Sequence, residues 1–262
     1  MKYLLFTFLL FSTLFSKEIK NITVESSSAI VNSTAEEAKN LALRRARSMI
    51  IENANGVTVV SNVLVKDGAL AAEYIKNYSR GIILNEKIEW LPITQFQKDK
   101  NSPPIPEYNV KITADVLIKE KETNLVINSS INKTVYSDNE KMNINLLSSE
   151  DVDIAIFFLG YDDKIYKLIP TLEERISLEK NKEIVIPRRG KDNFDLEVIV
   201  PEKMKNITEA IWIIAAKTKE KIPFHVYFNK DIYSLNEFFS IYSEISTKCN
   251  ETILPYHVYK EN

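Results

Sequence analysis

The chain has 262 residues, of which 45% are hydrophobic and 27% are charged, a composition typical of a globular protein that can bury sizeable cores. Its 34 lysine and arginine residues stand against 36 aspartate and glutamate residues, so the formal net charge at pH 7 is −2. This balance argues against a nucleic-acid-binding protein, because phosphate contacts require a basic surface.

The N-terminus has the layout of an export signal. Lys2 precedes an apolar run from Tyr3 to Leu14, and small polar residues follow it. The run is well short of the ~20 residues needed to span a bilayer, so we predict that residues 1–16 form a secretory signal peptide, cleaved after Ser16. No cysteine lies near this junction. We therefore expect an exported, periplasmic protein without a lipid anchor, and an uncleaved N-terminal anchor is the less favoured alternative.

The most legible element is a helix that follows a strand at residues 17–32. Thr34 and Glu37 have the spacing of a capping box at its start, and Gly56 follows its end, where a left-handed residue is favoured. Small and apolar side chains gather on one face of the helical wheel, which lets the helix lie close to a sheet. They are Ala38, Leu41, Ala42, Ala46 and Met49.

Three arginines lie on the same helix. Arg44 and Arg47 are expected to point away from the apolar face, whereas Arg45 falls among the apolar positions. Long basic side chains at the edge of an apolar face usually extend their charged group to water. We favour this interpretation of Arg45 over a contact with a partner.

Four further elements are predicted before residue 119: a strand of alternating valines, a second helix and a pair of strands. They span residues 57–65, 69–79, 82–93 and 108–118. Lys66–Gly68 has turn chemistry before the second helix, and Gly81 is expected to end that helix. Gln97–Glu107, with three prolines, is predicted to be an irregular loop that cannot enter the interior of a sheet.

This first part of the chain resembles a known module. The residues that carry the resemblance are Ala42–Val65, Asn77–Gly81 and Tyr108–Val116. They are similar to the N-terminal domain of the flagellar H-ring assembly protein T and of its relatives among small envelope lipoproteins, over Ile19–Ile118. The resemblance implies an α/β module of bacterial envelope proteins, without catalytic residues. The lipidation cysteine of those relatives is missing here.

A short charged segment, residues 119–123, is predicted to be the joint between two domains. Beyond it, short apolar runs separated by turns, several ending at a proline, indicate an antiparallel sandwich. The predicted strands are residues 133–136, 143–147, 152–159, 165–169, 184–186, 194–200 and 210–216.

The second part of the chain also resembles a family. The matching residues are Asp153–Lys164, Leu168–Pro170, Ile186–Pro187 and Phe194–Pro201. They are similar to a bacterial domain of unknown function with a β-sandwich of immunoglobulin type, over Val126–Lys217, with Thr171 in place of the family's usual asparagine. The resemblance implies an accessory or interaction domain.

The C-terminal segment is predicted to form a helix and a final strand. Ser234 and Glu237 have capping-box spacing, and a stripe of large apolar residues with Cys249 at its end follows at helical intervals. Because burying such a stripe stabilises a fold by several times ~1.5 kcal/mol, we expect this helix to dock on the sandwich. The final strand is placed at Ile253–Tyr259.

Few residues in the sequence suggest chemistry. All five glycines are assigned to turns or helix ends, so none remains for a phosphate-binding loop and no cofactor is expected. His225 and His257 have no further nitrogen or sulfur ligands at zinc spacing. No serine lies in a Gly-x-Ser-x-Gly turn, and Cys249, the only cysteine, belongs to the apolar stripe. A hydrolase using either histidine is therefore a minor alternative.

Two charged loops remain as candidates for surface contacts. Asp162 and Asp163 are predicted to form a solvated hairpin tip, because no further acidic residues follow at calcium-loop spacing. Arg188, Arg189 and Lys191 form the densest basic cluster, in a predicted exposed loop. This loop is our candidate contact for an anionic partner.

Together these patterns predict an α+β protein in two domains. An α/β module at residues 17–118, with two helices on a small antiparallel or mixed sheet, precedes an antiparallel β-sandwich at residues 124–222, with residues 223–262 docked on it. We predict a non-enzymatic accessory or interaction protein of the bacterial cell envelope, taking part in the assembly of an envelope or appendage structure, with other envelope proteins and not nucleic acid as partners. The main alternative is a periplasmic ligand-binding sensor module.

Overall fold

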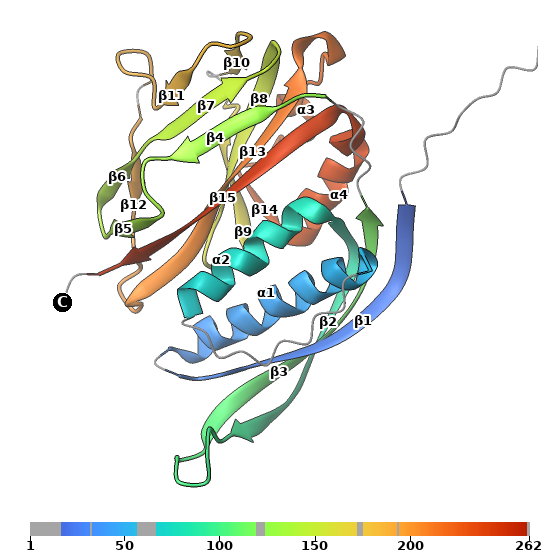
Figure 1. The fold of residues 1–262 in the computed structure, drawn as a ribbon, viewed down its shortest axis with the longest axis vertical. Helices are drawn as coiled ribbons and strands as arrows, with labels where there is room; N and C mark the ends of the chain where they lie inside the picture. The colour runs from blue at the N-terminus through green and yellow to red at the C-terminus, as the bar shows by residue number, and fades with distance from the viewer. Residues whose placement is uncertain are drawn as a thin grey trace, which may run out of the picture.

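The computed structural model describes residues 17–31, 33–56, 67–118, 124–171, 175–192 and 194–260, with the backbone alone for residues 67–71 (Figure 1). The predicted signal peptide, the predicted strand at residues 57–65 and the predicted joint at residues 119–123 lie outside the described residues. The fold is mixed α+β, with mostly antiparallel strands and a C-terminal helix. None of the helices within the described ranges is both long and apolar enough to cross a bilayer.

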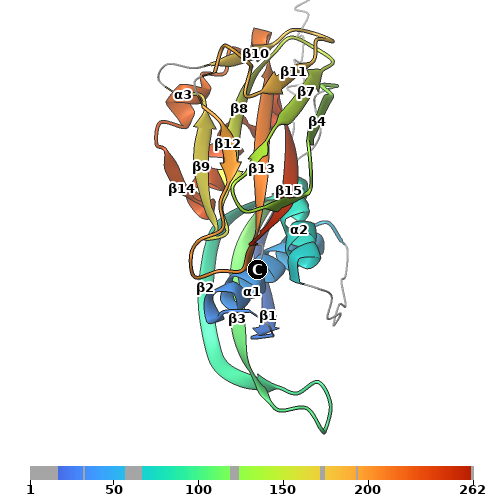
Figure 2. The same cartoon turned by 90° about the vertical axis from the view of Figure 1, so that its left-hand side faces the viewer.

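The first 118 residues contain a three-stranded antiparallel sheet with the order β1-β3-β2. Its strands are β1 (Lys17–Ala29), β2 (Ile82–Phe96) and β3 (Ile105–Ile118). The predicted strand pair is therefore correct but longer than expected, because β3 begins at Ile105 and includes Pro106 near its start. The paired ends of β2 and β3 extend beyond the rest of the molecule as an arm (Figures 1 and 2).

Helix α1 (Ala35–Ala54) covers one face of this sheet. The predicted capping box is confirmed, since the Glu37 amide donates to Thr34 Oγ1 at 3.2 Å and the Thr34 amide donates to Glu37 Oε2 at 2.6 Å. Ala38, Ala42 and Ala46 are buried, as the wheel predicts, whereas Leu41 and Met49 of the same predicted face are only partly buried. Gly56 has a φ of +75°, the left-handed conformation expected after the helix.

The second helix differs from its prediction at both ends. Helix α2 (Asp67–Asn77) includes Gly68, which was expected in a turn, and a 3-10 turn at Tyr78–Arg80 continues it. Gly81 has an extended φ of −173°, so it is not a left-handed helix end. A Cβ atom at Gly81 would lie 3.0 Å from Val116 Cγ1 and 3.3 Å from Ile51 Cγ2. The glycine is needed because the backbone approaches α1 and β3 closely there.

Both edge strands of the three-stranded sheet are bulged around one residue of the middle strand. Asn21 in β1 and Asn85 in β2 have φ values of 55° and 54°, and the pairing register shifts at both sites. The Asn21 amide donates to Asp115 Oδ1 and the Asn85 side chain donates to Asp115 Oδ2, both at 2.8 Å. The Asn85 bond, with the Asn21 bond, lowers the pKa of Asp115. One carboxylate therefore stabilises both bulges.

The second part of the chain is dominated by a seven-stranded sheet with the order β14-β9-β8-β13-β15-β5, in which β10 also pairs with β8. Its strands are β5 (Val135–Ser137), β8 (Val152–Leu159), β9 (Lys164–Ile169), β10 (Ile176–Leu178), β13 (Asn206–Lys217), β14 (Ile232–Ser234) and β15 (Cys249–Tyr259). The pairing of β15 with β5 is parallel and the others are antiparallel.

Two smaller antiparallel sheets, with the orders β11-β7-β4 and β12-β6, lie on one side of the large one. Their strands are β4 (Ile127–Ile131), β6 (Glu140–Met142), β7 (Ile144–Ser148), β11 (Ile184–Ile186) and β12 (Leu196–Val198). The predicted strands at residues 152–159 and 184–186 have the observed bounds. Short strands such as β4, β10 and β14 were not predicted, because runs of three to five residues carry little periodicity.

Helix α4 (Leu235–Ile245) follows the short α3 (Phe224–Tyr227), and its predicted N-cap is confirmed by the Glu237 amide, which donates to Ser234 Oγ at 3.2 Å. Phe238 packs against Phe157 of β8 and Trp212 of β13, with ring centroids 5.0 and 4.9 Å apart. Cys249 is buried but begins β15, so its predicted place on the helix is wrong.

One hydrophobic core joins the two parts of the chain. It contains α1, α2, the covered face of the three-stranded sheet, α4 and the face of β8 and β13 that α4 covers. Tyr78 after α2 and Phe239 of α4 meet in it edge to face, with centroids 6.1 Å apart. A second core fills the space between the other face of the large sheet and the two smaller sheets. Both faces of β13 are thus covered, and Ile207–Ala216 is buried throughout.

Candidate functional site

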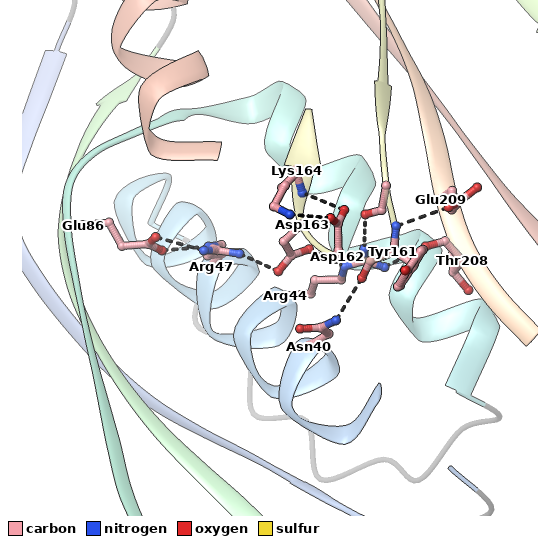
Figure 3. Close-up of polar contacts among 11 residues, drawn as sticks. Asn40, Arg44, Arg47, Glu86, Tyr161, Asp162, Asp163, Lys164, Thr208 and Glu209 are labelled. Carbon is pink, nitrogen blue, oxygen red and sulfur yellow. Dashed lines mark hydrogen bonds and ion pairs between the residues drawn. The ribbon is translucent and has the colours of Figure 1, made fainter. Parts of the chain in front are cut away.

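A group of buried charges lies where α1 meets the turn between β8 and β9 and the start of β13 (Figure 3). Two arginines come from α1, which belongs to the first part of the chain. Their partners come mostly from the second part. This group of residues is called the junction cluster below, and it comprises Arg44, Arg47, Glu86, Asp163 and Glu209.

Arg44 spans the boundary between the two parts with all three of its nitrogens. Nε donates to Asp163 Oδ1 at 2.8 Å, Nη1 to the Thr208 carbonyl at 2.8 Å and Nη2 to the Gly160 carbonyl at 2.9 Å. Only 4% of the residue is exposed. Binding to two backbone carbonyls fixes the start of β13 and the end of β8 against α1.

Arg47 lies one turn further along α1 and binds two carboxylates. Nε and Nη2 donate to the two oxygens of Glu86 at 2.7 and 3.0 Å, and Nη1 donates to Asp163 Oδ2 at 2.8 Å. Burial alone would lower the pKa of Arg47, but Glu86 and Asp163 outweigh it and hold that pKa above its ordinary value. Asp163 therefore connects the two arginines through its two oxygens.

The local backbone explains why an aspartate occupies this position. Asp163 has a φ of 58°, a left-handed conformation that aspartate and asparagine tolerate, and its amide donates to the Gly160 carbonyl at 3.1 Å. The predicted solvated tip is wrong for Asp163, because its side chain is only 10% exposed. Asp162 instead pairs with Lys164 at 3.1 Å and accepts the Tyr166 hydroxyl at 2.9 Å.

Glu209 is the fifth charged residue of the junction cluster. Its Oε2 accepts the Tyr256 hydroxyl at 3.1 Å, and its Oε1 accepts the Tyr161 amide at 3.3 Å. Burial raises the pKa of Glu209 to about 7, although these hydrogen bonds and Arg44 lower it. Asp163 and Glu86 already balance the two arginines, so Glu209 is the surplus carboxylate and holds its proton more strongly than an exposed glutamate.

A small pocket opens beside the junction cluster. It has a volume of about 80 Å³ and lies between the first half of α1, the end of β1 and the start of β13. Asn40 stands at its wall and donates through Nδ2 to the Tyr161 carbonyl at 2.9 Å. Its other polar lining residues are Ser28, Ser33, Glu37, Arg44, Tyr161, Asn206 and Thr208. Such a volume holds a few waters or a small polar ligand.

The predicted basic contact lies elsewhere, in the loop after β11. Arg188 binds Asp192, with Nε 2.7 Å from Oδ1 and Nη2 2.6 Å from the same oxygen. Arg189 and Lys191 are exposed on either side of Gly190, which has a φ of 73°. The loop is exposed as predicted, but Arg188 already has a carboxylate partner.

The two histidines lie apart. His257 Nδ1 is 3.1 Å from Thr208 Oγ1, and burial lowers the pKa of His257. His225 is exposed on α3. Within the described residues neither histidine has a carboxylate in hydrogen-bonding distance. Among the same residues no group of three or more histidine, cysteine, aspartate or glutamate side chains is placed to share a metal ion.

Sequence reasoning missed the junction cluster because its members are far apart in the chain. Arg44 and Asp163 are separated by 119 positions. The available signal was the spacing of Arg44 and Arg47, which places two arginines on one face of a helix whose opposite face is apolar. No family model matches the chain, and the search of curated proteins finds no match.

Proposed function

We propose that the protein is a non-enzymatic accessory or interaction protein of the bacterial cell envelope, exported to the periplasm, in which an α/β module and a β-sandwich of immunoglobulin type act as one rigid scaffold. The observation that carries this proposal is the junction cluster. Its arginines are engaged by carboxylates and backbone carbonyls of the chain itself, so these charges hold the two parts together.

The energetics of buried ion pairs support a fixed connection. Removing one partner from such a pair costs about 3–5 kcal/mol, because the other charge is left buried and uncompensated. Separating the two parts would leave Arg44 and Arg47 without Asp163 and would also expose the aromatic core around Phe238 and Phe239. Surfaces on the two parts therefore keep a constant spacing, which suits a protein that positions other components.

The proposed contact for an acidic envelope partner is the basic loop after β11. Arg189 and Lys191 are exposed there, whereas Arg188 is held by Asp192. Two exposed positive charges on one loop attract an acidic surface and speed its approach, an effect that salt screens.

Export and contact are tested in the same cells. Mass spectrometry of the periplasmic fraction should find a mature N-terminus at Lys17, and a photoreactive residue at position 189 or 191 should cross-link an envelope protein. Lys182, exposed on the neighbouring loop, provides the matched control position. Retention in the cytoplasm would overturn the envelope assignment. Equal cross-linking from positions 182 and 189 would overturn the loop assignment.

A second candidate, a periplasmic sensor of a small ligand, is favoured by the pocket beside the junction cluster. Its polar groups come from both parts of the chain, so a bound ligand would stabilise their contact. Thermal unfolding with monosaccharides and peptidoglycan fragments tests this function. A ligand should raise Tm for the wild type and not for Ser28→Phe, which fills the pocket. No rise with any of these probes, or an equal rise in the filled variant, would overturn it.

A further inference from the structure

We propose that two copies of this chain associate through the free edge of β2, pairing antiparallel about Ile88. The two three-stranded sheets would then join into one sheet of six strands. The residues that pair within the regular part of β2 are Lys87–Glu89, with Ile88 opposite Ile88 of the second copy. This association is a property of the edge itself and does not depend on the envelope function proposed above.

The edge is available for pairing along the arm. β2 is the outer strand in the order β1-β3-β2, and within the described residues no strand pairs with its other side. Figure 2 shows the lower part of β2 running along the outside of the arm, whereas its upper part passes beneath the large sheet, and β2 also contacts α4. The register shifts between Leu84 and Lys87 and between Leu91 and Thr94 bound a short regular segment.

The side chains of this edge are unusually apolar for a solvated strand. Ile88 and Trp90 are 43% and 42% exposed, and Ile93 beyond them is exposed as well. Ile88 lies opposite Ile112, and Trp90 opposite Val110, so both are on the face that α1 covers only in part. On β1, the other edge, none of the described residues is a large exposed hydrophobic. This difference selects β2 rather than β1 as the contact.

Charge complementarity identifies the occupant as a second copy. In an antiparallel pair centred on Ile88, Lys87 of each copy lies opposite Glu89 of the other, which gives two opposite-charge pairs by symmetry. Within the described part of the chain neither Lys87 nor Glu89 forms an ion pair. Within the sheet Glu89 already has Lys111 opposite it and Lys87 interacts electrostatically with Asp115, and a second copy would add an opposite charge on the free side of each residue.

The same pairing continues a charge pattern that already crosses the sheet. On the face away from α1, Glu25 of β1 lies opposite Lys111 of β3, and Lys111 lies opposite Glu89 of β2. Lys87 of the second copy would be the next residue in this row. Positive and negative side chains then alternate along this row across the new contact. If the pairing register were shifted by one residue, side chains on opposite faces of the sheet would lie opposite one another and the row would be interrupted.

The geometry also sets the size and closure of the contact. Pro92 has no amide hydrogen to donate, and the bulges at both ends stop the regular ladder, so pairing cannot extend along the strand. A two-fold contact uses the same edge on both copies and closes as a dimer. An area below ~1,200 Å² is typical of weak, transient complexes, so we expect association at micromolar concentrations or above.

Disulfide trapping tests the pairing. Opposed residues of neighbouring strands have Cβ atoms ~4.5–5.5 Å apart, near the separation that a disulfide requires. In Ile88→Cys the new thiol is exposed and Cys249 is buried, so mild oxidation should give a covalent homodimer. Glu25→Cys, which places an exposed thiol on the β1 edge, is the control. Equal rates of trapping in the two variants would overturn the proposal.

A charge exchange then tests the register. Lys87→Glu should weaken dimerisation about tenfold in sedimentation equilibrium, because both cross-copy pairs become repulsive. Lys87→Glu combined with Glu89→Lys should restore it, because each pair is attractive again with its order reversed. Both residues are exposed, so far-ultraviolet circular dichroism should show unchanged folding. Failure of the double variant to restore association, or trapping of position 88 in cells on a different protein, would overturn the second copy as the occupant.

Discussion

Arg44 and Asp163 lie 119 positions apart in the chain, yet Arg44 Nε and Asp163 Oδ1 are 2.8 Å apart in the interior. This contact connects the middle of the first helix to a hairpin turn of the second part. Asp163 also binds Arg47, so a single carboxylate is the counter-ion of two buried guanidinium groups. The stability of the connection between the two parts should therefore depend strongly on this one residue.

Asp163→Ala should destabilise the protein by about 3–5 kcal/mol, because Arg44 and Arg47 lose a shared buried counter-ion. Asp163→Asn should cost less, since asparagine tolerates the left-handed backbone and keeps the shape of the side chain. Urea denaturation monitored by circular dichroism measures both values. Asp162→Ala, at the adjacent position, is the matched control and should cost about 1 kcal/mol or less. Similar losses for Asp162→Ala and Asp163→Ala would contradict the role assigned to Asp163.

Glu209 predicts a specific dependence of stability on pH. Burial raises its pKa from 4.5 to about 7 in the folded protein, so between these values the folded state holds a proton that the unfolded state has released. Its contribution is therefore fully present below pH 4.5 and is lost as the pH rises to 7, by about 3 kcal/mol in total. Glu209→Gln cannot titrate and should lack this decline.

The measurement compares urea unfolding of wild type and Glu209→Gln at pH 5 and pH 8. The unfolding free energy of Glu209→Gln minus that of the wild type should be larger at pH 8 than at pH 5. Glu150→Gln, which alters a more exposed carboxylate, should follow the wild type. Parallel curves for wild type and Glu209→Gln would contradict the raised pKa.

Gly81 and Gly56 should respond to alanine for different reasons. In Gly81→Ala the new methyl group meets Val116 and Ile51, so we expect overpacking to cost about 1–3 kcal/mol. In Gly56→Ala no atom lies within 4 Å of the new Cβ, and the expected loss of about 1 kcal/mol comes from the left-handed φ of +75°. Val116→Ala should recover part of the loss in Gly81→Ala and none in Gly56→Ala. Thermal unfolding of the single and double variants would distinguish the two causes.

The core that α4 shares with the rest of the molecule predicts a large effect at Phe238. This ring is fully buried and contacts Phe157, Trp212 and Phe228, with centroids 5.0, 4.9 and 5.4 Å away. Phe238→Ala should cost about 3–5 kcal/mol in equilibrium denaturation, whereas Phe238→Leu, which leaves a smaller cavity, should cost less. A loss below 1 kcal/mol for the alanine variant would show that α4 contributes little to the core.

Local elements were largely predictable from the sequence, because their signals act between near neighbours. Thr34 and Glu37 predicted the start of α1, Ser234 predicted the start of α4, and short apolar runs bounded by turns or a proline located β8 and β11. The errors arose where a tertiary contact overrode a local preference. Gly81 serves close packing rather than a helix end, and Cys249 belongs to a strand that pairs with β13.

The sequence by itself determined which segments form helices and strands and which of their faces are apolar, since both follow from capping and periodicity within a few residues. Only the tertiary structure decided what the charged faces do. A helical wheel separates Arg44 and Arg47 from the alanines but cannot show that a second part of the chain covers them. Whether these arginines are solvated or are buried counter-ions of Asp163 depends on contacts between residues more than a hundred positions apart. Once those contacts bury the arginines, pairing with a carboxylate becomes necessary.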